Sequence, residues 1–188
     1  AKEKVLSRSR RIPKKVQELS SVVISRIRGL RATKHYKARD EEGKVEKINS
    51  LDNLDLLSDK WLILTRTLNR CEEICKILKD KGIYYETKKG KSYNVKLYKS
   101  ILAHIRYING EDITEIEMKD LKDFADEEDL QDKSLKWYEV FSNGSILERK
   151  YIRLMLSNKE KLNQGPRIKV STIHAEKGGE ADNVILVL

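Results

Sequence analysis

Apolar residues in the first half of the chain follow a strand, helix, strand pattern. Residues 61–65 form a continuous apolar run of strand length, typical of a strand buried on both faces of a parallel sheet. Residues 69–81 then have apolar positions at helical spacing, ended by Gly82, and residues 83–86 again suit a strand. Because the three elements follow one another within about 25 residues, they predict a βαβ unit of an α/β protein.

An amphipathic helix is predicted near the N-terminus, from Pro13 to Gly29. Proline often begins a helix, and glycine often follows its end. The apolar stripe of this helix comprises Val16, Leu19, Val23 and Ile27. Further along, residues 44–49 alternate in polarity and predict a short strand.

The second half of the chain begins with helical patterns and then returns to strands. Residues 94–108 predict another amphipathic helix. Shorter helical patterns follow within residues 111–165, at 113–124, 134–141 and 146–156. Residues 167–172 and 183–188 then have the pattern of strands, the last one purely apolar. We therefore expect a helical insertion over 111–165, after which the chain re-enters the first sheet.

Charge sets part of this insertion apart from the rest of the chain. The 188 residues carry a net charge of +9, from 39 Lys and Arg against 30 Asp and Glu. Residues 111–132 hold eleven of the acids and two of the lysines, so this segment has a charge of −9 and the other residues together have +18. A basic body of this kind indicates a polyanionic partner, such as nucleic acid or a membrane surface.

Membrane proteins and metal sites are disfavoured. No apolar run approaches the roughly 20 residues that span a bilayer, and no predicted helix pairs a Lys/Arg-rich face with a bulky apolar face. We expect no membrane partner and an intracellular, cytoplasmic location, associated with the nucleoid. Cys71 and Cys75 lie four residues apart in a helical pattern without a nearby Cys/His pair. We therefore expect reduced cysteines and no metal ligands.

The chain lacks a phosphate-binding loop of its own. Gly90-Lys91-Ser92 resembles the end of such a loop, but Tyr85 stands where the pattern needs its first glycine. The chain also ends inside an apolar strand, at Leu188. From these two features we expect a fragment of a longer protein, and not a complete NTPase.

Polar residues between the last two predicted strands are the strongest candidates for chemistry. Thr172, His174 and the pair Gly178-Gly179 follow a strand, where open α/β sheets bind ligands. The alternative is a polar loop in which His174 makes a local hydrogen bond. The segment resembles motif V of the UvrD/Rep-type superfamily 1 helicases, Thr-x-His-x-x-Lys-Gly-x-Glu. The matching residues are Thr172, His174, Lys177, Gly178 and Glu180.

Residues 6–13 are similar to motif IV of the same family, Leu-x-x-x-Tyr-Arg followed by a helix. Leu6 matches the leucine, and Arg11 falls on the arginine that in the family reaches the γ-phosphate of ATP. A fixed guanidinium suits the charge that develops on a transferred phosphoryl group. Arg10 stands where the family often has a tyrosine stacked on adenine, and an arginine can also stack.

Residues 63–70 resemble the next motif of the family in chain order. In that motif a strand ends in Arg-Thr-Asn, whose side chains contact single-stranded DNA. Arg66 and Thr67 match it, whereas Leu68 replaces the asparagine. The alternative is a strand end with one solvated arginine.

The resemblance implies the second RecA-like motor domain of an ATP-dependent DNA helicase of UvrD/Rep type, an α/β fold with a parallel sheet flanked by helices. Residues 1–110 and 166–188 would form this domain, ending before the last motif, and residues 111–165 would replace the family's inserted domain. The implied partners are single-stranded or partly duplex DNA and the first motor domain, which would hold most of the ATP and Mg²⁺. Family members of this type move 3′ to 5′.

The resemblance also assigns roles to residues. Arg11 would be catalytic. Nucleotide contacts would come from Arg10, Arg11, Gly178 and Glu180. DNA contacts would come from Arg66, Thr67, Thr172 and His174. A different class remains open, a non-catalytic nucleic-acid-binding or protein-interaction module with the helicase fold, and Arg10 and Leu68 favour it.

Overall fold

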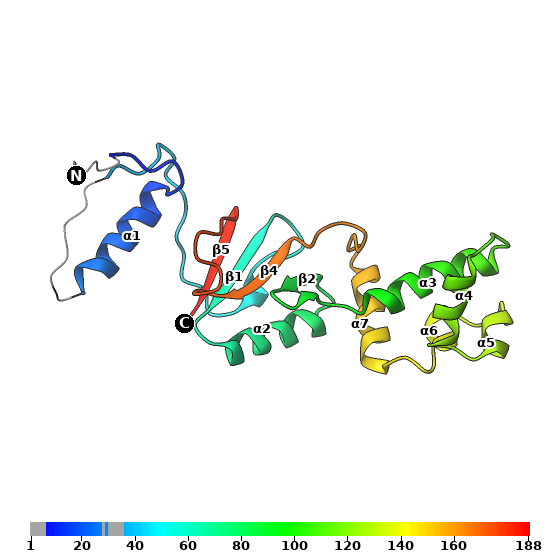
Figure 1. Cartoon of the computed structure of the whole chain (residues 1–188). Coiled ribbons are helices and arrows are strands. Elements are labelled where there is room, and N and C mark those ends of the chain that lie inside the picture. Colours follow the sequence, from blue (N-terminus) through cyan, green and yellow to red (C-terminus); the bar gives the residue numbers. More distant parts are fainter. Residues whose placement is uncertain (1–6, 28, 30–35) are drawn as a thin grey trace, which may run out of the picture. The chain divides into compact units, whose positions relative to one another are not determined.

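The computed structural model describes residues 7–27, 29 and 36–188 (Figure 1). Leu6, the first residue of the predicted motif IV, lies outside this range. The chain forms two compact units, Ala1–Leu54 and Asp55–Leu188. The predicted domain boundaries, at residues 110/111 and 165/166, both fall inside the second unit and stay a prediction.

The first unit contains the predicted N-terminal helix, α1 (Lys14–Ser25), with Pro13 immediately before its first residue. Gln17 binds a neighbouring segment to this helix. Its side chain donates to the carbonyl of Tyr36 and accepts from the backbone N–H of Ala38, at 3.1 Å. No residue of α1 is buried, so the predicted apolar stripe is open to solvent.

The predicted strand at residues 44–49 is wrong, because these residues form an exposed irregular segment. An alternating pattern makes a strand only where a neighbouring strand offers hydrogen-bonding partners. Within the described part of the first unit, the one such pairing is an isolated bridge between Arg8 and Lys37. A short 3-10 turn, η1 (Leu51–Asn53), ends the unit.

The second unit is built on a five-stranded sheet with the order β3-β2-β4-β1-β5. β1 is parallel to β4 and β5, β2 is parallel to β4, and the short β3 is antiparallel to β2. The strands are β1 (Trp61–Thr65), β2 (Tyr85–Thr87), β3 (Gly90–Lys91), β4 (Ile168–Thr172) and β5 (Asn183–Val187). The predicted α/β class and the return of the chain to the first sheet are confirmed.

Helix α2 (Leu68–Asp80) packs against β1 and β4 (Figure 1). Ile63 of β1 is in register with Val170 of β4 and Ile185 of β5, and all three are buried. The last strand is largely apolar in sequence but is not buried on both faces. β5 lies at the edge of the sheet, and Val184 and Leu186 on its other face remain half exposed.

The predicted βαβ unit is confirmed, with β2 beginning two residues later than expected. Gly82 follows α2 in the left-handed backbone region, at φ +64°. The N–H of Ile83 donates to the carbonyl of Leu78 at 2.9 Å, which closes the helix in the manner of a Schellman motif. Ile83 therefore completes the helix end, and the strand starts at Tyr85.

Residues 95–157 form the helices α3 (Val95–Ile108), α4 (Glu115–Lys122), α5 (Glu127–Gln131), α6 (Trp137–Val140) and α7 (Ile146–Ser157). Four of them are the predicted helices, while α5 did not stand out in the sequence. α3 packs against α4 and α6. At the other end, the hydroxyl of Tyr151 in α7 donates to the carbonyl of Ile83 at 2.7 Å, which connects the helices to the sheet.

The acidic segment folds against basic residues of α3. Lys96 forms ion pairs with Asp120, at 3.0 Å, and with Asp123, and Arg106 pairs with Glu117. Glu117 also completes a capping box with Thr114 at the start of α4. Part of the segment's negative charge is thus compensated within the helical region itself.

Candidate nucleic-acid interface

Two segments that are distant in sequence meet at the carboxyl edge of the sheet. Thr65, the last residue of β1, is in register with Thr172, the last residue of β4. The pairing extends one residue further, because the N–H of Ile173 donates to the carbonyl of Thr65 at 3.0 Å. Arg66-Thr67 and Thr172-Ile173-His174 therefore emerge side by side.

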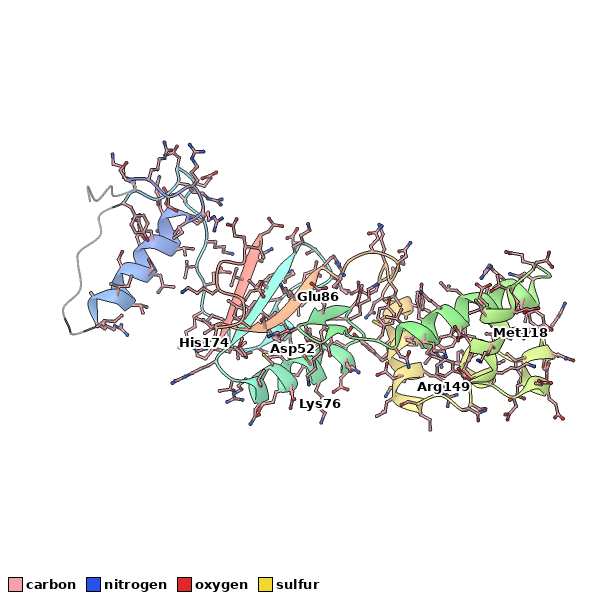
Figure 2. All side chains as sticks on the ribbon, in the orientation of Figure 1. Asp52, Lys76, Glu86, Met118, Arg149 and His174 are labelled. Atoms are coloured by element: carbon pink, nitrogen blue, oxygen red, sulfur yellow. The ribbon has the colours of Figure 1, made fainter. Side chains whose placement is uncertain are left out.

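The side chains at this edge are accessible. Arg66, Thr67 and His174 are exposed and Thr172 is partly exposed. Figure 2 shows His174 just beyond the end of β4. Leu68, which departs from the family's asparagine, is also 71% exposed at the start of α2. The edge thus presents a guanidinium, two hydroxyls and an imidazole to solvent, with one aliphatic side chain beside them.

A buried hydroxyl orders the turn that carries Arg66 and Thr67. Thr65 is fully buried, and its Oγ1 donates to the carbonyl of Thr67 at 2.8 Å and lies 3.0 Å from the Sγ of Cys71 in α2. Thr67 in turn caps α2, its Oγ1 accepting from the backbone N–H of Arg70 at 3.4 Å. Sequence reasoning missed Thr65, because a threonine ending an apolar strand gives no signal of a partner below it.

The loop after β4 is folded on Thr172. The Thr172 carbonyl accepts from the N–H groups of Ala175 and Glu176, at 3.1 and 3.2 Å, and its Oγ1 accepts from Ala175 at 3.3 Å. Among the described residues the hydroxyl of Thr172 acts only as an acceptor, so its hydrogen can be donated to a ligand. Glu176 binds Lys169 of β4, with Oε1 and Nζ 2.8 Å apart, and this hydrogen bond raises the pKa of the Lys169 ammonium.

The Gly178-Gly179 pair has a local structural reason. Gly178 adopts φ +90°, a conformation that L side chains rarely take. A Cβ on Gly179 would lie 2.6 Å from Oε1 of Glu176, the oxygen that binds Lys169. The loop conformation therefore favours glycine at 178, and a side chain at 179 would displace that of Glu176; the predicted nucleotide contact of Gly178 stays a prediction.

The predicted nucleotide residues are divided between the two units. Arg10 and Arg11 are exposed in the first unit, before α1. Ser9 shapes this segment, its Oγ accepting from the N–H groups of Arg11 and Ile12 at 3.3 and 3.2 Å. Gly178 and the exposed Glu180 belong to the second unit. A shared nucleotide site for these residues stays a prediction.

His104, on α3, belongs to the core of the helical region. It is fully buried, and its ring lies edge to face with Phe141 at 5.6 Å between centroids. In the described part of the chain neither ring nitrogen has a hydrogen-bonding partner of good geometry. Burial lowers the pKa of His104, and the backbone of Leu130 opposes this only in part. The neutral imidazole is therefore the form that the fold accommodates.

Cys71 and Cys75 are free thiols on α2. Burial raises the pKa of Cys75, so its thiol stays protonated. Across residues 7–27, 29 and 36–188, no group of three or more His, Cys, Asp or Glu side chains gathers to hold a metal ion. In the same ranges, no helix has the length and apolar character needed to cross a membrane.

Comparisons of the chain with protein-family models, curated proteins and solved structures found no significant match. The interpretation of the carboxyl edge therefore depends on its geometry and on the motif resemblances.

Proposed function

We propose that this chain is the second RecA-like motor domain of a UvrD/Rep-type superfamily 1 DNA helicase, and that the carboxyl edge of β1 and β4 binds single-stranded DNA. The observation that carries the proposal is the register of Thr65 with Thr172. This register brings the Arg-Thr after β1 and the Thr-x-His after β4 to one exposed edge of a mostly parallel sheet. Two motifs that bind the same DNA strand must meet in this way.

The chemistry of the edge suits a DNA backbone of any sequence. The guanidinium of Arg66 can bind phosphate oxygens through two N–H groups, and the hydroxyls of Thr67 and Thr172 can each donate to one. The imidazole of His174 adds a further donor. Contacts of this kind fix the position of a strand without reading its bases, as a motor that moves along DNA requires.

ATP would be held mainly by the first motor domain, and the described part of this chain gathers no Mg²⁺ ligands of its own. Arg11 would extend its guanidinium to the γ-phosphate, and Glu180 would accept a hydrogen bond from the nucleotide sugar. Arg10 would stack on the base, and the backbone at Gly178 would lie against the nucleotide. Closing and opening of the two motor domains would then move the DNA strand over the carboxyl edge.

The proposal is tested by DNA binding of the 188-residue chain, measured by fluorescence anisotropy with a labelled oligo(dT). A protein contact with one phosphate contributes about 0.7 to the slope of log K against log salt for single strands. Arg66→Ala should therefore lower this slope by about 0.7 and weaken binding about 5-fold at roughly 0.1 M salt. Lys150→Ala is the matched control, since Lys150 is also exposed but belongs to helix α7 and not to the ends of β1 and β4.

A further variant separates the hydroxyl contact from the charge. Thr172→Val should weaken binding at every salt concentration while leaving the salt slope unchanged, because a hydroxyl displaces no counterion. Equal binding by the wild type and by the Arg66 and Thr172 variants would overturn the proposal.

The second candidate is a non-catalytic module that binds nucleic acid with the same edge. The exposure of Leu68, where the family has a polar DNA contact, favours it. The candidates differ in ATP hydrolysis by a protein that joins this chain to a first motor domain. The motor requires DNA-stimulated hydrolysis there and none from the chain alone. DNA binding without any stimulated hydrolysis would favour the non-catalytic module.

A further inference from the structure

We infer that Lys88 and Lys89, at the tip of the β2–β3 hairpin, extend the DNA-binding edge and hold phosphates of the same single strand. This inference rests on the proposed function, and it adds a third element, beyond β1 and β4, to the surface along which the strand runs.

The hairpin tip lies at the same edge of the sheet as the other contacts. β2 is parallel to β4, with Glu86 in register with Lys169 (Figure 2 labels Glu86). β2 ends at Thr87, and Lys88 and Lys89 form the two-residue turn that leads into β3. Following the register, this turn stands beside the last residues of β4, which end at Thr172.

The spacing of the strands fits a continuous DNA path. Neighbouring strands lie about 4.8 Å apart, so β2 is about 10 Å from β1, with β4 between them. Three nucleotides of a stacked strand cover about the same length, at roughly 3.4 Å each. A strand held by Arg66 and Thr172 therefore reaches the hairpin within a few nucleotides.

Hydrogen bonds at its base and at its tip fix the conformation of the β2–β3 hairpin. The Oγ of Ser92 accepts from the N–H of Tyr85 at 3.2 Å and lies 2.7 Å from the hydroxyl of Tyr151 in α7. At the tip, Oγ1 of Thr87 accepts from the N–H of Lys89 at 3.1 Å. These bonds fix the turn before any ligand arrives, so binding needs to order only the two lysine side chains.

The charge at the tip is available to an anion. Lys88 and Lys89 are exposed, and no carboxylate of the described residues is paired with either of them. The nearest acid along the hairpin, Glu86, is opposite Lys91 in the β2–β3 pairing. On the neighbouring strand end, Glu176 is bound to Lys169. The two lysines thus add positive charge toward the carboxyl end of β4 that the described residues do not neutralise.

The test compares two double variants of the full chain that lose the same charge. Lys88→Ala/Lys89→Ala, the tip variant, removes both positive charges of the hairpin tip. Lys133→Ala/Lys150→Ala, the control, removes the charges of two exposed lysines of the helical region. At about 0.7 per phosphate contact, the tip variant should lower the salt slope by about 1.4 and weaken oligo(dT) binding about 25-fold at roughly 0.1 M salt. The control should bind like the wild type.

Binding of oligo(dT) strands of increasing length shows where along the strand Lys88 and Lys89 make contact. With oligo(dT) from about 2 nucleotides, which are too short to pass from β1 to the hairpin, up to about 16 nucleotides, the tip variant and the wild type should bind the shortest strands similarly. They should diverge once the strand is long enough to pass from β1 to the hairpin. The Arg66→Ala variant should bind oligo(dT) more weakly than the wild type at every length.

The outcomes separate this inference from the proposed function. If Arg66→Ala binds oligo(dT) weakly while the tip variant binds like its control, the hairpin contact is overturned and the proposed function stands. A defect of the tip variant that is equal at all lengths would also contradict a path across the edge. Wild-type binding by both Arg66→Ala and the tip variant would overturn both proposals.

Discussion

The buried hydroxyl of Thr65 offers a sharp test of how the DNA-binding edge is ordered. Thr65→Val keeps the shape of the side chain but removes the donor to the Thr67 carbonyl and the contact with the Sγ of Cys71. An unsatisfied buried partner costs about 1–3 kcal/mol. The Thr67 carbonyl belongs to an exposed turn where water can replace part of the bond, so we expect the lower half of that range, about 1–2 kcal/mol.

Thermal unfolding followed by circular dichroism measures this loss. For a chain of this size, about 1 kcal/mol lowers Tm by roughly 2–4 °C, so Thr65→Val should unfold about 2–8 °C earlier than the wild type. The variant should also bind oligo(dT) more weakly, by up to the roughly 5-fold expected for full loss of the Arg66 contact.

Thr65→Ser is the matched control. It keeps the hydroxyl but loses one buried methyl group, which also costs about 1 kcal/mol. Its Tm should therefore fall while its DNA affinity stays at the wild-type value. The reasoning is refuted if the serine variant binds DNA as weakly as the valine variant, or if valine leaves both Tm and affinity unchanged.

Three other predictions concern stability and catalysis. Burial lowers the pKa of His104 in the folded chain, so the unfolded chain binds a proton at this imidazole more readily. The contribution of the neutral imidazole to stability is therefore complete above about pH 6.5 and is lost as the pH falls below that value. His104→Phe should therefore show a smaller drop in Tm between about pH 7.5 and 5.5 than the wild type, and an equal drop would contradict a buried neutral imidazole. In a protein with both motor domains, Arg11→Ala should reduce DNA-stimulated ATP hydrolysis by about 10³-fold or more and leave DNA binding within several-fold, whereas unchanged turnover would contradict the arginine-finger role. Gly82→Ala should destabilise the chain by about 1–3 kcal/mol in a denaturant titration, because its Cβ would lie 2.5 Å from that of Leu154; a variant as stable as the wild type would contradict this packing.

The elements of the sheet could be predicted where a local pattern decides the structure. The strand at 61–65 and the helix over 69–81 have periodicities that need no knowledge of their neighbours. The strand predicted at 44–49 failed because a strand also needs a partner, and alternation alone does not supply one. The half-exposed face of 183–187 was missed for a related reason, since the apolar sequence does not tell an edge strand from a central one.

In the candidate interface, too, some residues could be predicted from local sequence patterns and others depend on tertiary packing. Arg66, Thr67, Thr172 and His174 were chosen from their positions after predicted strands, and parallel pairing brings those strand ends together. The residue that orders the turn, Thr65, was missed because its hydrogen bond to Thr67 and its contact with Cys71 depend on packing of α2 against β1. The position of Lys88 and Lys89 likewise depends on the register of β2 with β4, which no local pattern determines.

The most direct test of the central claim is an NMR titration of the ¹⁵N-labelled chain with oligo(dT), following each backbone amide. We predict that the largest shift changes fall on residues 66–68 and 172–178, at the carboxyl ends of β1 and β4, and that they weaken with added salt. Changes confined to the helices between residues 95 and 157, or no changes at these strand ends, would contradict the account.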